Sequence, residues 1–344
     1  MRFDKTLSAT SRLLVASLLG AGLFGAGLAV AASGASAKIM MKFHHDLPED
    51  SAQHVAAVKF QKLVAEKTGG EIVVKIFPSN ALGNDVEATQ QMQLGAIEAA
   101  IIPTAKLSNF QPSMQLPDLP FVFPSPAVAH KFLDSEVGDQ LLATLGKVGL
   151  VGVTFWESGF KQFTCNNPIT EPASFSGRKV RVMQSPIIIE QFKALDANPV
   201  PIAFTETYTA LQQHVVDCQE NPLVSITKMK FFEVQSHMVI SNHAYLGYAF
   251  VYSKKWFDKL SADQQKAIVA AAKEVTPFQR ANTAEREAGY LKTIKDSGTN
   301  VTTLSPAVIK QFQAKTLSVH EKFAESIGAD LLKAAHAKIE ALQK

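Results

Sequence analysis

The order of strand-like and helix-like segments is the strongest constraint on the fold of this chain. Residues 39–43 and 72–77 predict strands, each followed by a helical pattern, and residues 97–102 predict an apolar third strand. The alternation restarts at residues 179–183, after a Pro-rich passage. Apolar strands that alternate with helices are typical of a parallel sheet covered on both faces. We therefore expect two successive α/β units, with the first crossing between them near residues 156–159.

The C-terminal part of the chain predicts helices rather than further strands. A short apolar strand at residues 249–252 precedes Ser261 and Gln264, which have the spacing of a capping box. Ser305 is followed by Pro306, which is a helix cap with Pro in the first turn. We expect these helices to pack on the outside of the sheets.

The N-terminus has the pattern of a secretory signal. Three basic residues precede an apolar run at residues 13–32, and the small-residue exit Ala35-Ser36-Ala37 follows. This order predicts export and cleavage after Ala37. The alternative is an uncleaved membrane anchor, because about twenty apolar residues can span a bilayer. No later run is long enough, so we expect a soluble, exported mature protein.

The charge balance bears on the partners of the mature protein. The formal net charge is +3 at pH 7, and loss of the leader lowers it to +1, because the leader carries three basic residues and one acidic residue. Such a small charge gives no field that attracts nucleic acid or an anionic membrane, so we expect neither partner. About 300 mature residues are enough for two domains with ordinary cores.

Cysteine usage is sparse. Cys165 and Cys218 allow at most one disulfide, and an exported chain of this size does not need a disulfide framework. Because the sequence cannot place the two Cα atoms within bridging distance, it favours two small buried thiols over a bridge.

Polar groups are concentrated between residues 177 and 248. Arg181 lies in a predicted strand just before a helix start at Ser185-Pro186. There, its guanidinium presents a rigid fork of donors that suits two-point contact with a carboxylate. An ion pair with a neighbouring Glu or Asp explains the residue equally well. Both interpretations stay open.

Two further residues are candidates for contact with the same ligand. Lys161 is a second cation, although a lone Lys is usually a solvated surface charge. Together with Arg181 it would match a ligand with two carboxylates. Asn221 precedes Pro222 in a predicted turn, where its amide can donate to a ligand oxygen or close an Asx-turn.

The remaining signals are weaker. Phe204 and Tyr208 flank a helix cap, and aromatic residues at that spacing are more often core than ligand walls. His44, His45 and Asp46 are adjacent on a strand, so they cannot all face one metal ion. We therefore expect neither a metal nor a cofactor.

No familiar catalytic motif occurs in the sequence. The chain has no H-E-x-x-H, no G-x-S-x-G, no G-x-x-x-x-G-K and no G-x-G-x-x-G after a strand. This pattern predicts a binding site without chemistry, and so a protein that is not an enzyme.

With these segments assembled, the chain resembles the solute-binding proteins of tripartite ATP-independent periplasmic (TRAP) transporters, the DctP family. The resemblance runs from about residue 39 to beyond residue 270. It is strongest in four segments, which are GRKVRV (177–182), ANP (197–199), TETYTALQ (205–212) and VDCQENP (216–222).

The resemblance implies two α/β domains of the periplasmic-binding-protein type, with a hinged interdomain cleft and extra C-terminal helices. Domain I would comprise residues 38–158 and about 246–286, and domain II would comprise residues 159–245 and about 287–344. The Arg at the position of Arg181 would form a salt bridge to the ligand carboxylate, which Asn221 would help to hold. The further ligand contacts that the resemblance suggests are Phe204, Gln184, Thr104, His45, Trp156 and Tyr245.

The ligand that the resemblance implies is a small organic acid. Sialic-acid-binding members carry a second Arg where this chain has Lys161, whereas members similar to C4-dicarboxylate binders often have Lys. The segment SNHAYLGY at residues 241–248 also looks like the dicarboxylate branch. Malate, succinate or fumarate is therefore the first choice, and other organic acids stay open. The implied partners are the integral membrane subunits of a TRAP transporter, the implied location is the periplasm, and we expect a monomer.

One departure from the family concerns Cys218, which stands where the family usually has Gly. If that position requires a positive φ, Cys would cost about 1 kcal/mol and displace the segment that carries Asn221. Two other functions stay open. One is an exported enzyme acting on a small carboxylic acid, with Glu206, Glu220 or His45 in proton transfer, and the other is a ligand-binding sensor module.

Overall fold

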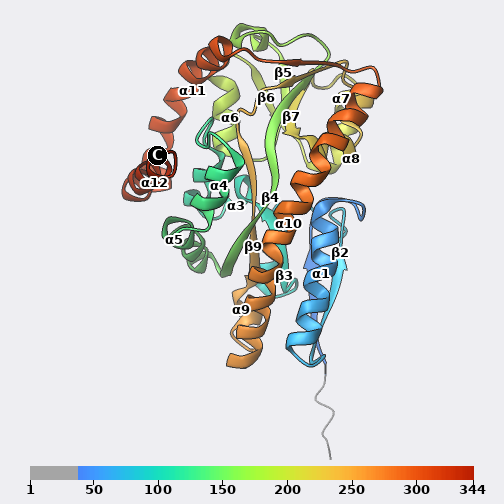
Figure 1. Cartoon of the computed structure of the whole chain (residues 1–344), viewed down its shortest axis with the longest axis vertical. Helices are drawn as coiled ribbons and strands as arrows, with labels where there is room; N and C mark the ends of the chain where they lie inside the picture. The colour runs from blue at the N-terminus through green and yellow to red at the C-terminus, as the bar shows by residue number, and fades with distance from the viewer. Residues whose placement is uncertain (1–37) are drawn as a thin grey trace, which may run out of the picture. The chain divides into compact units, whose positions relative to one another are not determined.

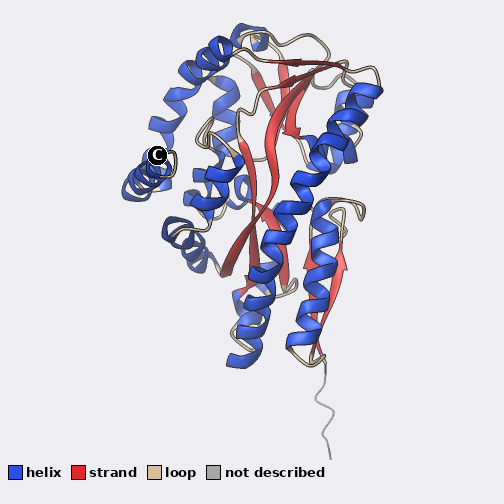
Figure 2. Cartoon of the chain, viewed as in Figure 1, coloured by secondary structure: helices blue, strands red, loops and turns tan. Residues whose placement is uncertain are grey.

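A computed structural model describes residues 38–344 (Figure 1). The predicted leader and its cleavage point lie outside the described residues. Strands run through the middle of the described part, with helices on either side (Figure 2). The strands are β1 (Ile39–His44), β2 (Ile72–Phe77), β3 (Ala99–Pro103), β4 (Leu150–Cys165), β5 (Lys179–Val182), β6 (Asn198–Pro201), β7 (Cys218–Pro222), β8 (His237–Ile240), β9 (Tyr245–Ser253) and β10 (Asn300–Thr303).

The helices include two long C-terminal ones, α10 and α11. The α-helices are α1 (Ala52–Lys67), α2 (Asp85–Leu94), α3 (Thr104–Leu107), α4 (Pro126–Leu133), α5 (Glu136–Thr144), α6 (Pro186–Lys193), α7 (Thr207–Gln212), α8 (Leu223–Lys228), α9 (Lys254–Phe257), α10 (Ala262–Asp296), α11 (Pro306–Ile327) and α12 (Ala329–Ala341). Short 3-10 helices are η1 (Pro112–Asp118), η2 (Leu145–Val148), η3 (Pro172–Phe175), η4 (Phe204–Glu206) and η5 (Phe231–Glu233). Within residues 38–344, none of the helices combines the length and the apolar character needed to cross a bilayer.

The sheet is mixed, so the expectation of a purely parallel sheet is wrong. The strand order is β2-β1-β3-β9-β4-β7-β5-β6, with β8 beside β4 and β10 beside β8. The pairs β1·β2, β1·β3, β5·β6 and β5·β7 are parallel, as the alternation predicts. β9 is antiparallel to both β3 and β4, and β4 is antiparallel to β7. The antiparallel pairs all involve β4 or β9, which lie between the strands β2-β1-β3 and the strands β7-β5-β6.

β4 is the strand that runs from the β1–β3 part of the sheet to the β5–β7 part. A crossing is predicted near residues 156–159, but the chain stays in one strand from Leu150 as far as Cys165. The register against β9 shifts between Glu157 and Gly159, and Gly159 has φ of 97°. This bulge turns the strand without ending it, which is a typical use of glycine in a sheet.

Helix boundaries follow the capping signals. The Ser261 hydroxyl accepts from the Gln264 amide, the Gln264 side chain accepts from the Ser261 amide, and the predicted capping box is confirmed. α4 and α5 are separate helices, because Asp134 ends the first helix and Ser135 caps the second.

The main hydrophobic core lies where β1, α1, β4 and β9 meet. Phe43 packs on Phe60 and Phe250 with ring centroids 5.4 and 5.3 Å apart, and Trp156 closes the cluster against Phe250 at 5.5 Å. Full burial of side chains of this size contributes roughly 1.5–3 kcal/mol each. This core fixes the ends of β1 and β4 from which several candidate site residues project.

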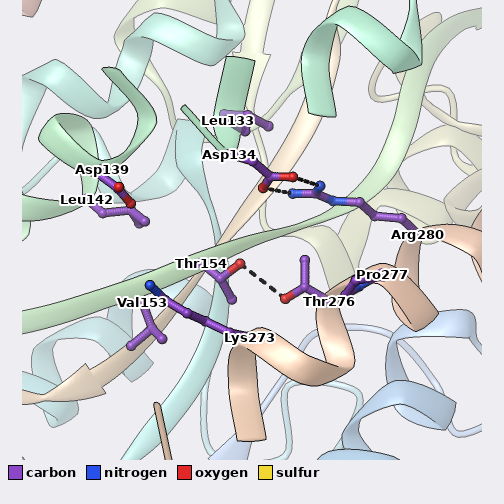
Figure 3. A pocket seen from close by; sticks show the side chains of 10 residues that line it. All are labelled: Leu133, Asp134, Asp139, Leu142, Val153, Thr154, Lys273, Thr276, Pro277 and Arg280. Carbon is purple, nitrogen blue, oxygen red and sulfur yellow. Dashed lines mark hydrogen bonds and ion pairs between the residues drawn. The ribbon is translucent and has the colours of Figure 1, made fainter. Parts of the chain in front are cut away.

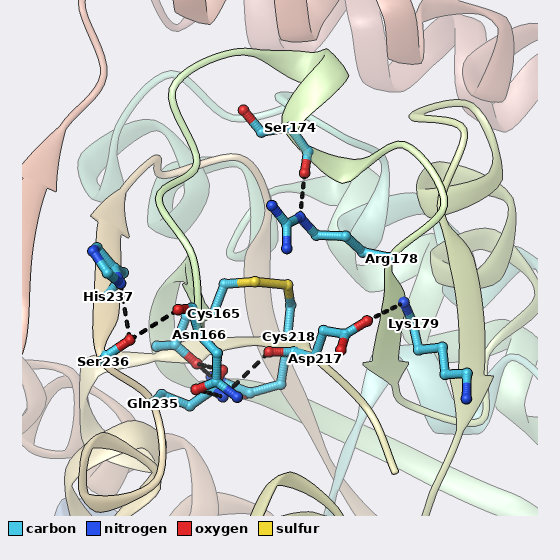
Figure 4. Close-up of a disulfide and its surroundings, with 12 residues drawn as sticks. Cys165, Asn166, Ser174, Arg178, Lys179, Asp217, Cys218, Gln235, Ser236 and His237 are labelled. Atoms are coloured by element: carbon cyan, nitrogen blue, oxygen red, sulfur yellow. Dashed lines mark hydrogen bonds between the residues drawn. A yellow bond between two sulfur atoms is a disulfide. The ribbon is translucent and has the colours of Figure 1, made fainter. Parts of the chain in front are cut away.

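Cys165 and Cys218 form a disulfide, so the expectation of two separate thiols is wrong (Figure 4). The two residues are register partners in β4 and β7, and their Cα atoms are 4.1 Å apart. Strand pairing brings the thiols together although 53 positions separate them in sequence. The condition for backbone strain at Cys218 is not met, because Cys218 is not among the described residues with positive φ.

Candidate functional site

Arg181 is fully buried near the end of β5. Its Nε and Nη2 both donate to the carbonyl oxygen of Ile202, at 3.0 and 2.8 Å. Its Nη1 has no hydrogen-bond partner among the described residues, and no described carboxylate forms an ion pair with the guanidinium. The neighbouring acid expected under the ion-pair interpretation is therefore not in contact.

The charge of Arg181 is poorly compensated by the protein. Burial lowers the pKa of Arg181 to about 10, although the carboxylate of Glu220 and, less strongly, those of Asp46 and Asp85 oppose the shift. A buried guanidinium with one unused nitrogen is costly unless an anion completes its surroundings. A ligand carboxylate would supply that anion and accept from Nη1.

β7 carries the second group of candidate residues next to β5. Gln219 is level with Arg181 in the parallel pair, and Asn221 is level with Gln162 of β4. The predicted turn at residues 219–222 is thus the end of a strand, which leaves Asn221 buried. Its Nδ2 donates to Gln219 Oε1 at 2.6 Å, so a ligand oxygen would compete with Gln219 for that donor.

Lys161 is fully buried and already ion-paired. Its Nζ lies 3.2 Å from both carboxylate oxygens of Glu220 and 3.8 Å from Asp118 Oδ1. Burial opposes ionisation of Glu220, but Lys161 and His243 together hold its pKa below the usual range. The second predicted cation is thus present in the interior, with its charge matched by protein acids.

Asp118 and Thr104 lie beside Lys161. The Thr104 hydroxyl donates to Asp118 Oδ2 at 2.6 Å, while Asp118 Oδ1 has no hydrogen-bond partner among the described residues. Burial raises the pKa of Asp118 to about 7, against the opposing effects of Lys161 and Thr104. In this structure, the Thr104 hydroxyl is therefore bound to Asp118.

Phe204 separates two cations from different parts of the chain. Its ring centroid lies 6.0 Å from Arg181 Cζ and 5.8 Å from Lys106 Nζ, and the residue is buried. Lys106 pairs with Asp85 at the start of α2. The contact that Gln184 makes here is through its backbone, because its carbonyl accepts from Asn109 Nδ2 at 2.6 Å.

The last three candidates have different surroundings. His45 Nε2 lies 3.1 Å from His54 Nδ1, and burial lowers the pKa of His45 to about 3, which keeps the ring neutral. Trp156 packs in the core, and its buried Nε1 lacks a partner among residues 38–344. Tyr245 donates its hydroxyl to Glu157 Oε2 at 2.5 Å, so that group is already engaged.

The sequence interpretation missed Lys106, Asp85 and Asp118. Each is a charged residue that the fold buries, at a strand end, a helix start or within the Pro-rich passage. Asp118 stands between apolar residues and prolines in the segment QLPDLPFVF, which is a detectable signal of a buried acid. No group of three or more His, Cys, Asp or Glu side chains suited to a metal ion occurs among residues 38–344.

A separate hollow of about 260 Å³ lies beside α5, β4 and α10 (Figure 3). It is lined by Asp134 and Arg280, which form an ion pair, and by Thr154 and Thr276, which share a hydrogen bond. None of the predicted site residues lines it.

Known proteins share this architecture. Residues 43–326 match the family described as bacterial extracellular solute-binding protein, family 7 (DctP). The chain is 36% identical over 334 residues to the 2,3-diketo-L-gulonate-binding periplasmic protein YiaO of Escherichia coli K12. The match covers 96% of this chain and 98% of the relative.

Two solved structures have the same fold. A TRAP periplasmic solute-binding protein from Shewanella oneidensis with bound succinate gives a TM-score of 0.84 at 34% identity, over 88% of this chain and 99% of the other. The sugar-acid-binding protein DctPAm from Advenella mimigardefordensis, in complex with galactonate, gives a TM-score of 0.86 at 33% identity. The match covers 89% of this chain and 99% of that protein.

These similarities extend over almost all of the described residues. They confirm the predicted α/β fold of the periplasmic-binding-protein type, with long C-terminal helices. The relatives are solute-binding proteins rather than enzymes. The chain belongs to the DctP family, the solute-binding proteins of TRAP transporters, which bind small organic acids.

Proposed function

We propose that this protein captures a small organic acid by a salt bridge to Arg181 and delivers it to the membrane subunits of a TRAP transporter. The observation that carries the proposal is the fully buried guanidinium whose Nη1 has no partner among the described residues. A carboxylate at that position would satisfy the unused donor and neutralise the buried charge. Asn221 and Phe204 would then line the same ligand.

We further propose that residues 38–158 with about 246–286, and residues 159–245 with about 287–344, are two domains that close on the ligand. The polar contacts that connect the two sets in the site include Lys161 with Asp118, Asn109 with the Gln184 carbonyl, and the Tyr245 hydroxyl with Glu157. Lys228 adds an exposed pair with Asp50 at 2.5 Å. A ligand that contacts both domains only when they are closed would shift the population toward closure.

Two classes of acid are candidates for the ligand. C4-dicarboxylates such as malate, succinate and fumarate are favoured by the resemblance in the Lys161 segment and by the relative solved with succinate. Hydroxylated monocarboxylates are favoured by the ion pair that Lys161 already makes with Glu220, and by the relative solved with galactonate.

The proposed location is the periplasm, after cleavage behind Ala37. The support is the leader pattern in the sequence and the periplasmic relatives. N-terminal sequencing of the exported protein tests the cut, and light scattering tests the expected monomer. A mature chain that still begins at Met1 would exclude cleavage.

Isothermal titration calorimetry against a panel of organic acids tests the central proposal. At least one acid should bind the parent protein, and the variant Arg181→Ala should lose that binding because the carboxylate would enter a closed cleft without its partner. Near-parental affinity in the variant would remove Arg181 from the site. Uptake of the bound acid by cells that carry or lack the membrane subunits of the transporter tests delivery.

A further inference from the structure

We infer that the ligand is a hydroxylated monocarboxylate, whose one carboxylate meets Arg181 and whose hydroxyls meet the buried acids, rather than an acid with two carboxylates. The inference rests on the proposed function of Arg181 and narrows the class of ligand. It concerns what the rest of the site offers once the first carboxylate is bound.

The other buried cations near the site are already paired. Lys161 lies between Glu220 and Asp118, and Lys106 is bonded to Asp85. Of the three buried basic side chains in this cluster, Arg181 alone has no described acid in contact. A second ligand carboxylate would have to draw Lys161 away from Glu220 or share it with two protein carboxylates.

Some of the unfilled hydrogen-bonding positions of the cluster belong to carboxyl groups. Glu220 Oε2 is in ion-pair contact with Lys161 Nζ at 3.2 Å, but Asp118 Oδ1 and Asp85 Oδ1 are buried and lack a hydrogen bond within the described chain. A ligand carboxylate brings only lone pairs to these atoms, whereas a hydroxyl brings a donor as well as an acceptor. Lys161 Nζ and Asp118 Oδ1 are 3.8 Å apart, so a hydroxyl beside them can accept from one and donate to the other.

The balance of charge points the same way. Four buried carboxyl groups, Asp46, Asp85, Asp118 and Glu220, lie near enough to the three buried bases to interact with them. Burial raises the pKa of both Asp46 and Asp118 to about 7, so they are largely protonated in weakly acidic medium. Burial also opposes ionisation of Asp85, yet Lys106 and His44 hold its pKa at about 2.

With Asp46 and Asp118 protonated, the bases exceed the ionised acids by one charge. One ligand carboxylate brings the buried cluster to neutrality. A second carboxylate leaves an uncompensated negative charge in the interior, which is strongly unfavourable.

Four acids with four carbons each separate the effects of the hydroxyls and of the second carboxylate. They are butyrate, erythronate (2,3,4-trihydroxybutyrate), succinate and malate. We expect calorimetry on the parent protein to give erythronate at least about tenfold higher affinity than succinate, and malate higher affinity than succinate. Succinate binding as tightly as erythronate would overturn the inference while leaving the role of Arg181 intact. Failure of these four and of longer acids such as galactonate and glucarate would count against the proposed function itself.

The variant Asp118→Asn tests the role of the buried acids directly. At pH 8, where Asp118 with its pKa of about 7 is largely ionised, loss of its charge should lower the preference for erythronate over succinate by about tenfold, since the second carboxylate then meets one fewer negative charge. The matched control is Asp263→Asn on the exposed face of α10, which should leave the preference unchanged. An unchanged preference in Asp118→Asn would contradict the inference. If that variant does not fold, the ratio of the parent protein's affinities for erythronate and succinate decides.

Discussion

Two buried arginines show how different a structural and a binding guanidinium are in this molecule. Arg280 of α10 donates from Nη1 and Nη2 to the two oxygens of Asp134, at 2.6 and 2.9 Å (Figure 3). Its Nη2 also donates to the Phe155 carbonyl. Arg181 has only the Ile202 carbonyl. Burial opposes both charges, yet the contact with Asp134 raises the pKa of Arg280, whereas the pKa of Arg181 falls to about 10. An arginine that the fold buries without an acid in contact is available for a ligand, and one that grips its own acid is committed to the fold.

The largest expected effect is on ligand affinity in Arg181→Ala. Removal of one partner from a buried charged pair costs about 3 kcal/mol or more, which corresponds to over 100-fold in affinity. Arg181→Lys should also bind poorly, because an ammonium cannot reproduce the fork of donors. Calorimetry with the best acid of the panel measures both, and an Arg181→Lys variant with parental affinity would contradict two-point contact.

For Arg280→Met we expect a loss of stability rather than a loss of ligand affinity. The change removes three hydrogen bonds at one end of the crossing region, and we expect the free energy of unfolding to fall by about 2 kcal/mol. Asp134 is 55% exposed, so water can solvate it after the change. Chemical denaturation measures the loss. A clear loss of ligand affinity in the refolded variant would break the distinction between the two arginines.

Asp118 sharpens the contrast because, unlike Asp134, it is fully buried. Its pKa of about 7 lies above the ordinary 3.8, so the folded state holds its proton more tightly than the unfolded state does. Its contribution to stability therefore declines as pH rises between these two values. From pH 5 to pH 8, Asp118→Asn should gain about 2 kcal/mol relative to the parent. Chemical denaturation of both proteins at pH 5 and pH 8 measures this change. A stability difference between variant and parent that does not depend on pH would contradict the prediction.

The smallest effect is expected for Arg181→Met without ligand. Because the charge it removes has no described acid in contact, the unliganded protein should be as stable as the parent or about 1 kcal/mol more stable. Thermal unfolding without added acid checks this against Arg280→Met. A destabilisation equal to that of Arg280→Met would make Arg181 a structural residue too.

Local signals predicted much of the fold. The capping pairs Ser261–Gln264 and Ser305–Pro306 mark the starts of α10 and α11, since a cap acts within one turn of the helix. The continuation of β4 through Gly159 was missed because a glycine in a strand pattern signals either an end or a bulge. The choice depends on the pairing with β9, which lies far along the chain.

The site was accessible only in part. Arg181, Asn221 and Lys161 were singled out from the sequence, and the structure buries all three. The pairing of Lys161 with Glu220 depends on the register of β4 against β7, which no local pattern specifies. Lys106, Asp85 and Asp118 were missed for the same physical reason, since a charged residue is normally exposed unless the tertiary structure gives it a partner.

The disulfide has a practical consequence for anyone who prepares this protein. The bond closes a loop that contains β5, α6, β6 and α7, and hence Arg181 itself. Material made in a reducing cytosol would lack the tether, whereas material collected from an oxidising compartment would carry it. Two samples of identical sequence could therefore melt at different temperatures, and a thiol count should accompany every affinity that is compared between laboratories.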